Sequence, residues 1–494
     1  MNNERRISVN ALPAYIKAML IAFMFIGCLL VDRNLDLDFY FLYSFGRSIV
    51  HDGFPVKDVL SMHTDMNIIV QQWLTDVLFY RTYELWGKAG VIAIAYAVLA
   101  AYTVLMYRLC KIVTGNFFVS MSAAQISGML VAIYIVTRPQ IFTYLNFVLL
   151  LLFLEKYVKT EKAWWLCPLP LISCLQINIH ASMWLMLFVL MMPYVVSCVN
   201  IKLPRYQSPA RCKAAHLAAA MVAMVAAAFL NPYGHKALLY LFGSYGVNTI
   251  NQNIQEMQVT SIADANGKLY LGLLFLAAAV PMLCRRRKPE LRFICLALGT
   301  AVLGLTSYKA NVYFYIVGFV CAAHYFKDFD FRLKITANKR SKKEKIQLVV
   351  LIILLVLALV YLFFGQPEAK EDSIDQEIEH LSLAADYLDT QNRDEMVLYA
   401  GFNEGSYLEF RGYRPYLDGR AELFLEAKNG QFDYFNEFIR LNNGVLYYKD
   451  FLDKYGFTHI LVPTEGNYLY ISLIHDADYQ AAYTNEYYTV FTKA

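Results

Sequence analysis

The sequence predicts a polytopic α-helical membrane protein of about eleven membrane-spanning helices, followed by a small α/β soluble domain. Of its 494 residues, 58% are hydrophobic and only 17% are charged, whereas soluble domains average about 25% charged. Residues 366–494 carry 10 Lys and Arg against 23 Asp and Glu, while residues 1–365 carry 34 against 17. Two segments of opposite net charge indicate two environments, so we expect a membrane domain over 1–365 and a separate domain over 366–494.

The apolar residues are gathered in blocks separated by short polar loops. A hydrocarbon core of about 30 Å requires about 17–25 apolar residues for each helical crossing, and these blocks have about that length. The expected spans cover residues 13–31, 89–110, 117–136, 141–157, 163–179, 182–200, 213–230, 269–284, 291–307, 310–325 and 347–364.

Basic residues alternate between the loops, which predicts the orientation of the chain. Arg5 and Arg6 precede the first span, and every second loop after it is rich in Lys and Arg, up to the basic cluster at 327–345. We therefore expect a multi-pass protein of the cell membrane with a cytoplasmic N-terminus. An odd number of spans then makes the C-terminal domain extracytoplasmic.

Two outer loops, 32–88 and 231–268, are too long to be simple connections, and long ordered loops are often functional. Within the first loop, residues 68–86 repeat apolar side chains at helical spacing and carry aromatic residues suited to the headgroup region. This pattern predicts a helix lying near the interface, or equally an amphipathic helix that only packs against the bundle.

The C-terminal domain alternates helical and strand-like segments. A helix is expected over 371–391 and another helical stretch over 431–442, with strands near 397–400, 456–462 and 487–491. Such alternation is typical of a small α/β domain.

Asp36 and Asp38 follow the first span directly and are the first candidate catalytic residues. A carboxylate at the outer surface can act as a general base toward a sugar hydroxyl, or it can bind a divalent cation. The alternative is structural, because Asp is favoured at the start of a helix, where it accepts hydrogen bonds from free N–H groups.

Further ionisable residues share the outer side of the expected topology. A carboxylate together with Arg or Lys is what a phosphate leaving group requires, because cations stabilise the developing negative charge while a base accepts the proton. The candidate substrate-binding residues are Arg138, His180, Glu256, Lys309, Asp58 and His63. In the tail, Asp418 and Arg420 form a D-G-R pair that could bind an acceptor glycan or form a salt bridge within a turn.

The order of short motifs along the chain resembles the GT-C fold membrane glycosyltransferases, in particular bacterial multi-pass proteins that use polyprenyl-phosphate sugars. The resemblance covers most of the chain and starts with the run D-x-D-F-Y-F at Asp36–Phe41. The remaining motifs are Arg138–Gln140, Asn178–His180, Asn231–Gly234, Glu256, Gly405–Leu408, Leu417–Glu422 and Lys454–Phe457.

The resemblance implies an inverting glycosyltransferase that acts on the outer face of the membrane. It would transfer a sugar from a polyprenyl-phosphate donor to a glycan or lipid acceptor of the cell envelope. Asp38, with Asp36 beside it, matches the first-loop Asp that serves as the general base or as a ligand of a divalent cation such as Mg or Mn. No nucleic-acid partner is implied.

Two other functions remain open from the sequence. One is a non-catalytic or transport component of cell-envelope polysaccharide assembly, although a transporter would place ionisable residues at mid-span and repeat its broken helices. The other is a glycan polymerase or ligase, which would use larger donors.

Overall fold

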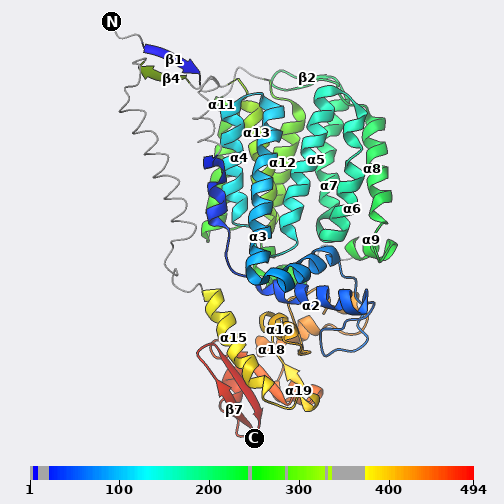
Figure 1. Cartoon of the computed structure of the whole chain (residues 1–494), viewed down its shortest axis with the longest axis vertical. Coiled ribbons are helices and arrows are strands. Elements are labelled where there is room, and N and C mark those ends of the chain that lie inside the picture. The colour runs from blue at the N-terminus through cyan, green and yellow to red at the C-terminus, as the bar shows by residue number, and fades with distance from the viewer. Residues whose placement is uncertain (1–3, 9–21, 243–247, 284–287, 329–331, 337–372) are drawn as a thin grey trace.

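The computed structural model describes residues 4–8, 22–242, 248–283, 288–328, 332–336 and 373–494 (Figure 1). Figure 1 shows a block of long helices at the top and a smaller domain at the bottom. The expected span 347–364 and most of the span 13–31 lie outside the described residues.

The upper block is a bundle of helices whose bounds follow the apolar blocks. Each span expected between 89 and 325 coincides with a helix or with consecutive helical turns. The helices are α3 (Trp73–Thr114), α4 (Phe117–Ala132), α5 (Gln140–Thr160), α6 (Leu169–Ile179), α7 (Trp184–Met191), α8 (Ala214–Ala228), α11 (Ala265–Leu283), α12 (Leu291–Thr306) and α13 (Asn311–Tyr325).

By length and composition, three helical segments of the described chain could each cross a membrane: Trp73–Thr114, Gln140–Thr160 and Ala181–Cys198. Several other apolar helices have 10–17 residues. The count of about eleven spans therefore stays a prediction, whereas the predominantly helical architecture is confirmed.

The first long loop forms a layer beneath the bundle. Helix α2 (Leu37–Asp52) runs across the bundle in Figure 1, and the first part of α3 lies beside it. The expected helix 68–86 begins only at Trp73, and Gly87 then adopts a non-helical φ of 60° that kinks α3. This kink separates the first part of α3, which lies beside α2, from the part that runs through the bundle, and a residue with a side chain would be strained there.

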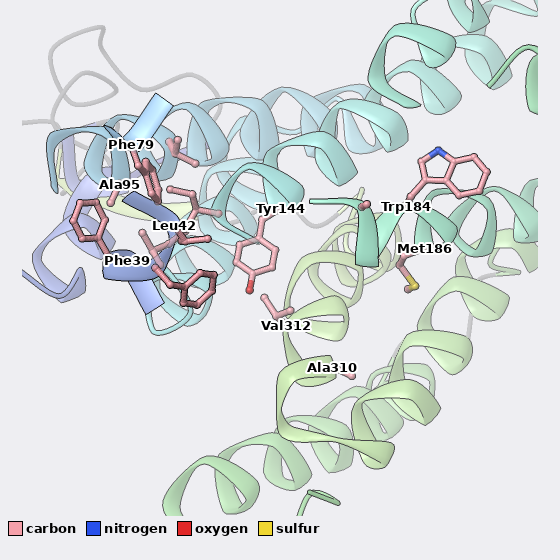
Figure 2. Packing of buried hydrophobic residues seen from close by; sticks show 14 of the residues in the cluster. Phe39, Leu42, Phe79, Ala95, Tyr144, Trp184, Met186, Ala310 and Val312 are labelled. Atoms are coloured by element: carbon pink, nitrogen blue, oxygen red, sulfur yellow. The ribbon is translucent and has the colours of Figure 1, made fainter. Parts of the chain in front are cut away.

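Aromatic side chains attach this layer to the bundle. Phe39 of α2 and Phe79 of α3 are both fully buried, and their ring centroids lie 5.9 Å apart. Figure 2 shows this pair close to Leu42. Tyr144 of α5 lies between this group and Val312 of α13. Burial of such large side chains fixes the orientation of α2 and therefore of the carboxylates at its start.

The C-terminal domain combines helices with a sheet, as expected, but the sheet has four strands where three were predicted. Its strand order is β5-β6-β8-β7, in which β5 and β6 are parallel and the other neighbours are antiparallel. The strands are β5 (Leu398–Tyr399), β6 (His459–Pro463), β7 (Tyr479–Thr484) and β8 (Tyr488–Lys493). The helices are α15 (Ser373–Asp389), α16 (Phe402–Phe410), α17 (Glu426–Asn429), α18 (Tyr434–Asn442), α19 (Tyr448–Tyr455) and α20 (Tyr468–Leu473).

Helix α16 packs on α2, and this contact holds the C-terminal domain against the first loop. The rings of Tyr40 and Tyr407 lie 4.9 Å apart, as do those of Tyr43 and Phe410. Gly405 permits the close approach of α16 to the following chain, because a Cβ there would lie 1.7 Å from the carbonyl oxygen of Leu417.

A buried ion-pair cluster lies within this interface. Arg420, whose side chain is only 8% exposed, contacts Asp58 of the first loop as well as Asp418 and Glu409 of its own domain. The side chains of all three carboxylate residues are fully buried. The guanidinium therefore links the two domains inside the protein, where an unpaired charge is costly.

We predict that Arg420→Met destabilises the folded chain by about 3–5 kcal/mol, because it leaves buried carboxylates without their cation. Thermal unfolding of the purified protein in detergent would measure this loss. Arg393→Met is the matched control, since Arg393 is 46% exposed and pairs with Asp389 at the surface; it should cost less than about 1 kcal/mol. Equal losses in the two variants would contradict the prediction.

Candidate active site

The start of α2 brings Asp36 and Asp38 to one cation. Asp36 caps the helix by accepting a hydrogen bond from the Asp38 N–H, so the helix-cap interpretation is correct for Asp36. The same carboxylate also accepts a hydrogen bond of 2.7 Å from Nε of Arg138. Nη1 of Arg138 lies 3.1 Å from Oδ2 of Asp38, so the guanidinium binds both carboxylates.

Glu256 of the second long loop extends this network to a second cation. Its Oε2 lies 3.5 Å from Nη1 of Arg138, and its Oε1 accepts a hydrogen bond of 3.0 Å from Nζ of Lys309. Residues from four separate parts of the chain thus form one continuous cluster of alternating charge.

The environment of Asp38 suits a proton acceptor. Burial, opposed by Arg138 and reinforced by Asp36 and Glu256, raises the pKa of Asp38 to about 7. Its side chain is still 25% exposed, so a substrate can reach it. A carboxylate with a pKa near the working pH is an efficient general base.

Glu256 is held in its ionised form. Burial by itself would raise the pKa of Glu256, but Lys309 and Arg138 keep that pKa below its ordinary value. The two neighbouring carboxylates therefore differ, because Asp38 can exchange a proton near pH 7 while Glu256 remains an anion that holds the two cations.

His180 lies near this cluster but is bound by its own neighbours. Nδ1 of His180 lies 2.9 Å from Thr143 Oγ1, and Nε2 lies 2.9 Å from Ser182 Oγ. Burial, followed by the charge of Lys309, lowers the pKa of His180 to about 3, so the ring is neutral at pH 7.

A cavity of about 1350 Å³ opens beside the charged cluster. Asp38, Arg138, Glu256 and Lys309 line it from the membrane domain and its outer loops. The C-terminal domain supplies the opposite wall with Tyr399, Gly401, Phe402, Asn403, Glu404, Gly419, Phe435, Phe438, Ile439, Asn442, Leu461, Val462, Pro463 and Asn467. The cavity therefore lies between the two domains.

Four of the expected site residues lie elsewhere. Asp58, Asp418 and Arg420 contact one another in the buried cluster between the domains. Nε2 of His63 donates a hydrogen bond of 2.8 Å to the carbonyl oxygen of Tyr416, and its ring is stacked on Tyr434. Among the described residues that line the cavity, none of these four is present.

The sequence interpretation missed the wall formed by the C-terminal domain. Glu404 directly precedes the motif Gly405–Leu408, and Gly419 lies inside the motif Leu417–Glu422, but the sequence indicates no role for either residue. The role of Gly419 depends on distance alone: a Cβ added there would lie 2.7 Å from Oδ1 of Asp38. Only a glycine lets this loop cover the carboxylate so closely.

The expected divalent cation does not fit this arrangement. The carboxylates of Asp36, Asp38 and Glu256 are turned toward Arg138 and Lys309, which already neutralise them. Across the described ranges, no group of three or more His, Cys, Asp or Glu side chains is disposed to hold a metal ion. No step below is assigned to a metal.

Comparison by sequence finds no match to a protein-family model and no match to a curated protein. Comparison of structures does find solved proteins of similar fold. The oligosaccharyltransferase of Archaeoglobus fulgidus, crystallised with a tethered acceptor peptide, superposes with a TM-score of 0.55 at 11% identity, over 97% of this chain and 74% of that one.

Two other solved structures have similar scores. ArnT from Cupriavidus metallidurans, bound to undecaprenyl phosphate, gives a TM-score of 0.52 at 12% identity over 97% of both chains. The arabinofuranosyltransferase AftD from Mycobacteria gives 0.53 at 11% identity, over 98% of this chain and 42% of that one. The chain therefore has the fold of the GT-C membrane glycosyltransferases.

Proposed function

We propose that this chain is a glycosyltransferase that moves a sugar from a polyprenyl-phosphate donor to an acceptor hydroxyl, with Asp38 as the general base. The observation that carries the proposal is the position of Asp38: a carboxylate with a pKa of about 7 lies beside two cations in a cavity between the domains. Structures of the same fold were solved with dolichol-phosphate and with undecaprenyl phosphate, which supports a lipid-linked donor.

Arg138 and Lys309 are the groups suited to the donor phosphate. Both line the cavity, and Glu256 holds them on one wall by contacting each of them. Positioned cations stabilise the negative charge that develops on a leaving phosphate, which is a large contribution to catalysis in a site that excludes water. Arg138 can bind phosphate with two parallel N–H groups, whereas Lys309 acts as a point charge.

The reaction then balances without a further reagent. The acceptor oxygen forms a bond to the anomeric carbon of the donor sugar, and the bond from that carbon to the phosphate oxygen breaks. The proton of the acceptor hydroxyl passes to Asp38, and the lipid phosphate leaves against Arg138 and Lys309. Attack opposite the leaving group inverts the anomeric centre.

The remaining candidates act in this proposal by positioning. Asp36 fixes the start of α2 and orients Arg138 through the hydrogen bond to Nε. Asp58, His63, Asp418 and Arg420 hold the C-terminal domain over the cavity. The basic loops predict a cytoplasmic N-terminus, and in that orientation the reaction takes place on the outer face of the membrane, next to cell-envelope acceptors.

We predict that Asp38→Asn abolishes transfer while the protein remains folded, because the amide accepts no proton from the acceptor hydroxyl. Purified protein in nanodiscs would be assayed with a panel of polyprenyl-phosphate sugars, with release of the lipid phosphate as the readout. Asp52→Asn, at the exposed end of the same helix, is the matched control and should keep full activity.

The pH dependence gives a second readout of the same role. Because the ionised form of Asp38 is the active one, the rate should rise with pH through about 7 and level off above it. Full turnover by Asp38→Asn would remove this residue from the reaction. A wild-type chain that turns over none of the donors would instead favour a non-catalytic role in envelope assembly.

We predict that Gly419→Ala slows transfer, because the new Cβ would collide with Oδ1 of Asp38 and displace the base. A displacement of about 1 Å at a reacting group can cost about 10²-fold in rate. Gly299→Ala is the control, since a Cβ at that position of α12 meets open space. Wild-type turnover in Gly419→Ala would show that the loop does not constrain the base.

A further inference from the structure

The cavity has a second wall whose chemistry the proposed donor does not use. A cavity of about 1350 Å³ is larger than the 300–1,000 Å³ that is typical of a site for one small ligand. The cations lie on the membrane-domain side, while the C-terminal domain contributes a carboxylate, three amides and aromatic rings. The cavity therefore has room for a second, different substrate, and the polar and aromatic groups of the second wall are available to bind it.

Glu404 is the charged group of this wall. The residue is only 5% exposed although it lines the cavity. Among the described residues, no other residue donates a hydrogen bond to its carboxylate, which accepts one only from its own backbone N–H. Burial, followed by the charge of Glu377, raises the pKa of Glu404 to about 7. A buried carboxylate with so few hydrogen bonds is unfavourable unless a ligand supplies more of them.

Gly401 lets this carboxylate approach the backbone closely, next to an aromatic ring. A Cβ at Gly401 would lie 2.7 Å from Oε2 of Glu404 and 3.6 Å from Cε2 of Phe438. The rings of Phe402 and Phe435 continue this surface, with centroids 5.8 Å apart. The carboxylate of Glu404 and the ring of Phe438 thus lie close together on one wall of the cavity, beside Gly401.

Amide side chains complete the wall. Asn403, Asn442 and Asn467 line the cavity, and the buried Oδ1 of Asn442 has no hydrogen-bond partner among the described residues. Amides both donate and accept, so they match hydroxyl groups, which do the same. The wall carries one acid and belongs to a domain of strongly negative net charge, so it disfavours anionic ligands.

We propose that this wall, formed by Glu404, Phe438 and the three asparagines, is the acceptor subsite and binds a neutral, hydroxyl-rich glycan end. The proposal rests on the proposed function and specifies its acceptor. A sugar ring would lie against Phe438 with its hydroxyl groups donating to Glu404, while the hydroxyl to be glycosylated faces Asp38 across the cavity. A peptide would leave the carboxylate without such a set of donors.

The test measures glycan binding directly, without the donor. The full-length chain in labelled nanodiscs would be applied to an array of neutral oligosaccharides, uronate-containing and sulfated oligosaccharides, and serine- and threonine-rich peptides. We expect the wild type to retain neutral oligosaccharides in preference to the other two groups. Glu404→Ala and Phe438→Ala should each weaken this binding about tenfold or more, because the first removes a charged hydrogen-bond acceptor and the second removes the aromatic surface.

The controls separate loss of binding from loss of folding. Glu426→Ala removes an exposed carboxylate of the same domain and should bind as the wild type does. Glu404→Gln and Phe438→Leu conserve shape, so they should unfold at the wild-type temperature and lose part of the binding. Any of three results would overturn the proposal. The wild type could retain only peptides or anionic glycans, it could retain no neutral glycan, or Glu404→Ala could bind neutral glycans as strongly as the wild type does.

This outcome is independent of the donor assay. If the wild type turns over no donor, the proposed transferase activity is refuted. The array needs no donor and reports only on glycan binding by the second wall. A chain that turns over donor but retains no neutral glycan would keep the proposed function and lose this acceptor class.

Discussion

The pairing of Arg420 with buried carboxylates is the interaction on which the rest of the structure depends. One guanidinium contacts Asp58 from the first loop and Asp418 and Glu409 from the C-terminal domain, and it lies 4.8 Å over the ring of Phe45. These groups are buried away from water. Separating the domains would therefore either expose the charges to water or leave them buried without a partner of opposite charge. The cluster therefore fixes the position of the adjoining Gly419 against Asp38.

The properties of the charged site follow from that fixed position. The close cover of Asp38 removes water and raises its pKa, while Arg138 opposes full neutralisation. Glu256, which contacts both Arg138 and Lys309, holds them apart from each other and directed at the cavity. The charged residues belong to the first part of the chain, while the C-terminal domain covers Asp38 and forms the opposite wall of the cavity.

The sequence predicted the layers of the fold better than it predicted the contacts of the site. Apolar blocks defined the helices from 89 to 325, and the charge split marked the C-terminal domain, because both patterns are local. The meeting of Asp36, Asp38, Arg138, Glu256 and Lys309 was expected only as residues sharing one face. Glu404 and Gly419 could not be recognised, since their importance comes from a distance across the domain interface that no spacing along the chain encodes. The same limit applies to Asp58 and Arg420, which were expected in a substrate site and instead lie against each other.

The most direct test of the central claim is a cryo-EM structure of the Asp38→Asn chain in nanodiscs with a donor that the wild type turns over. The account predicts the donor phosphate within hydrogen-bonding distance of both Arg138 and Lys309, with the sugar between them and the wall that carries Glu404. A phosphate bound away from these two cations, or a sugar outside the cavity between the domains, would contradict it.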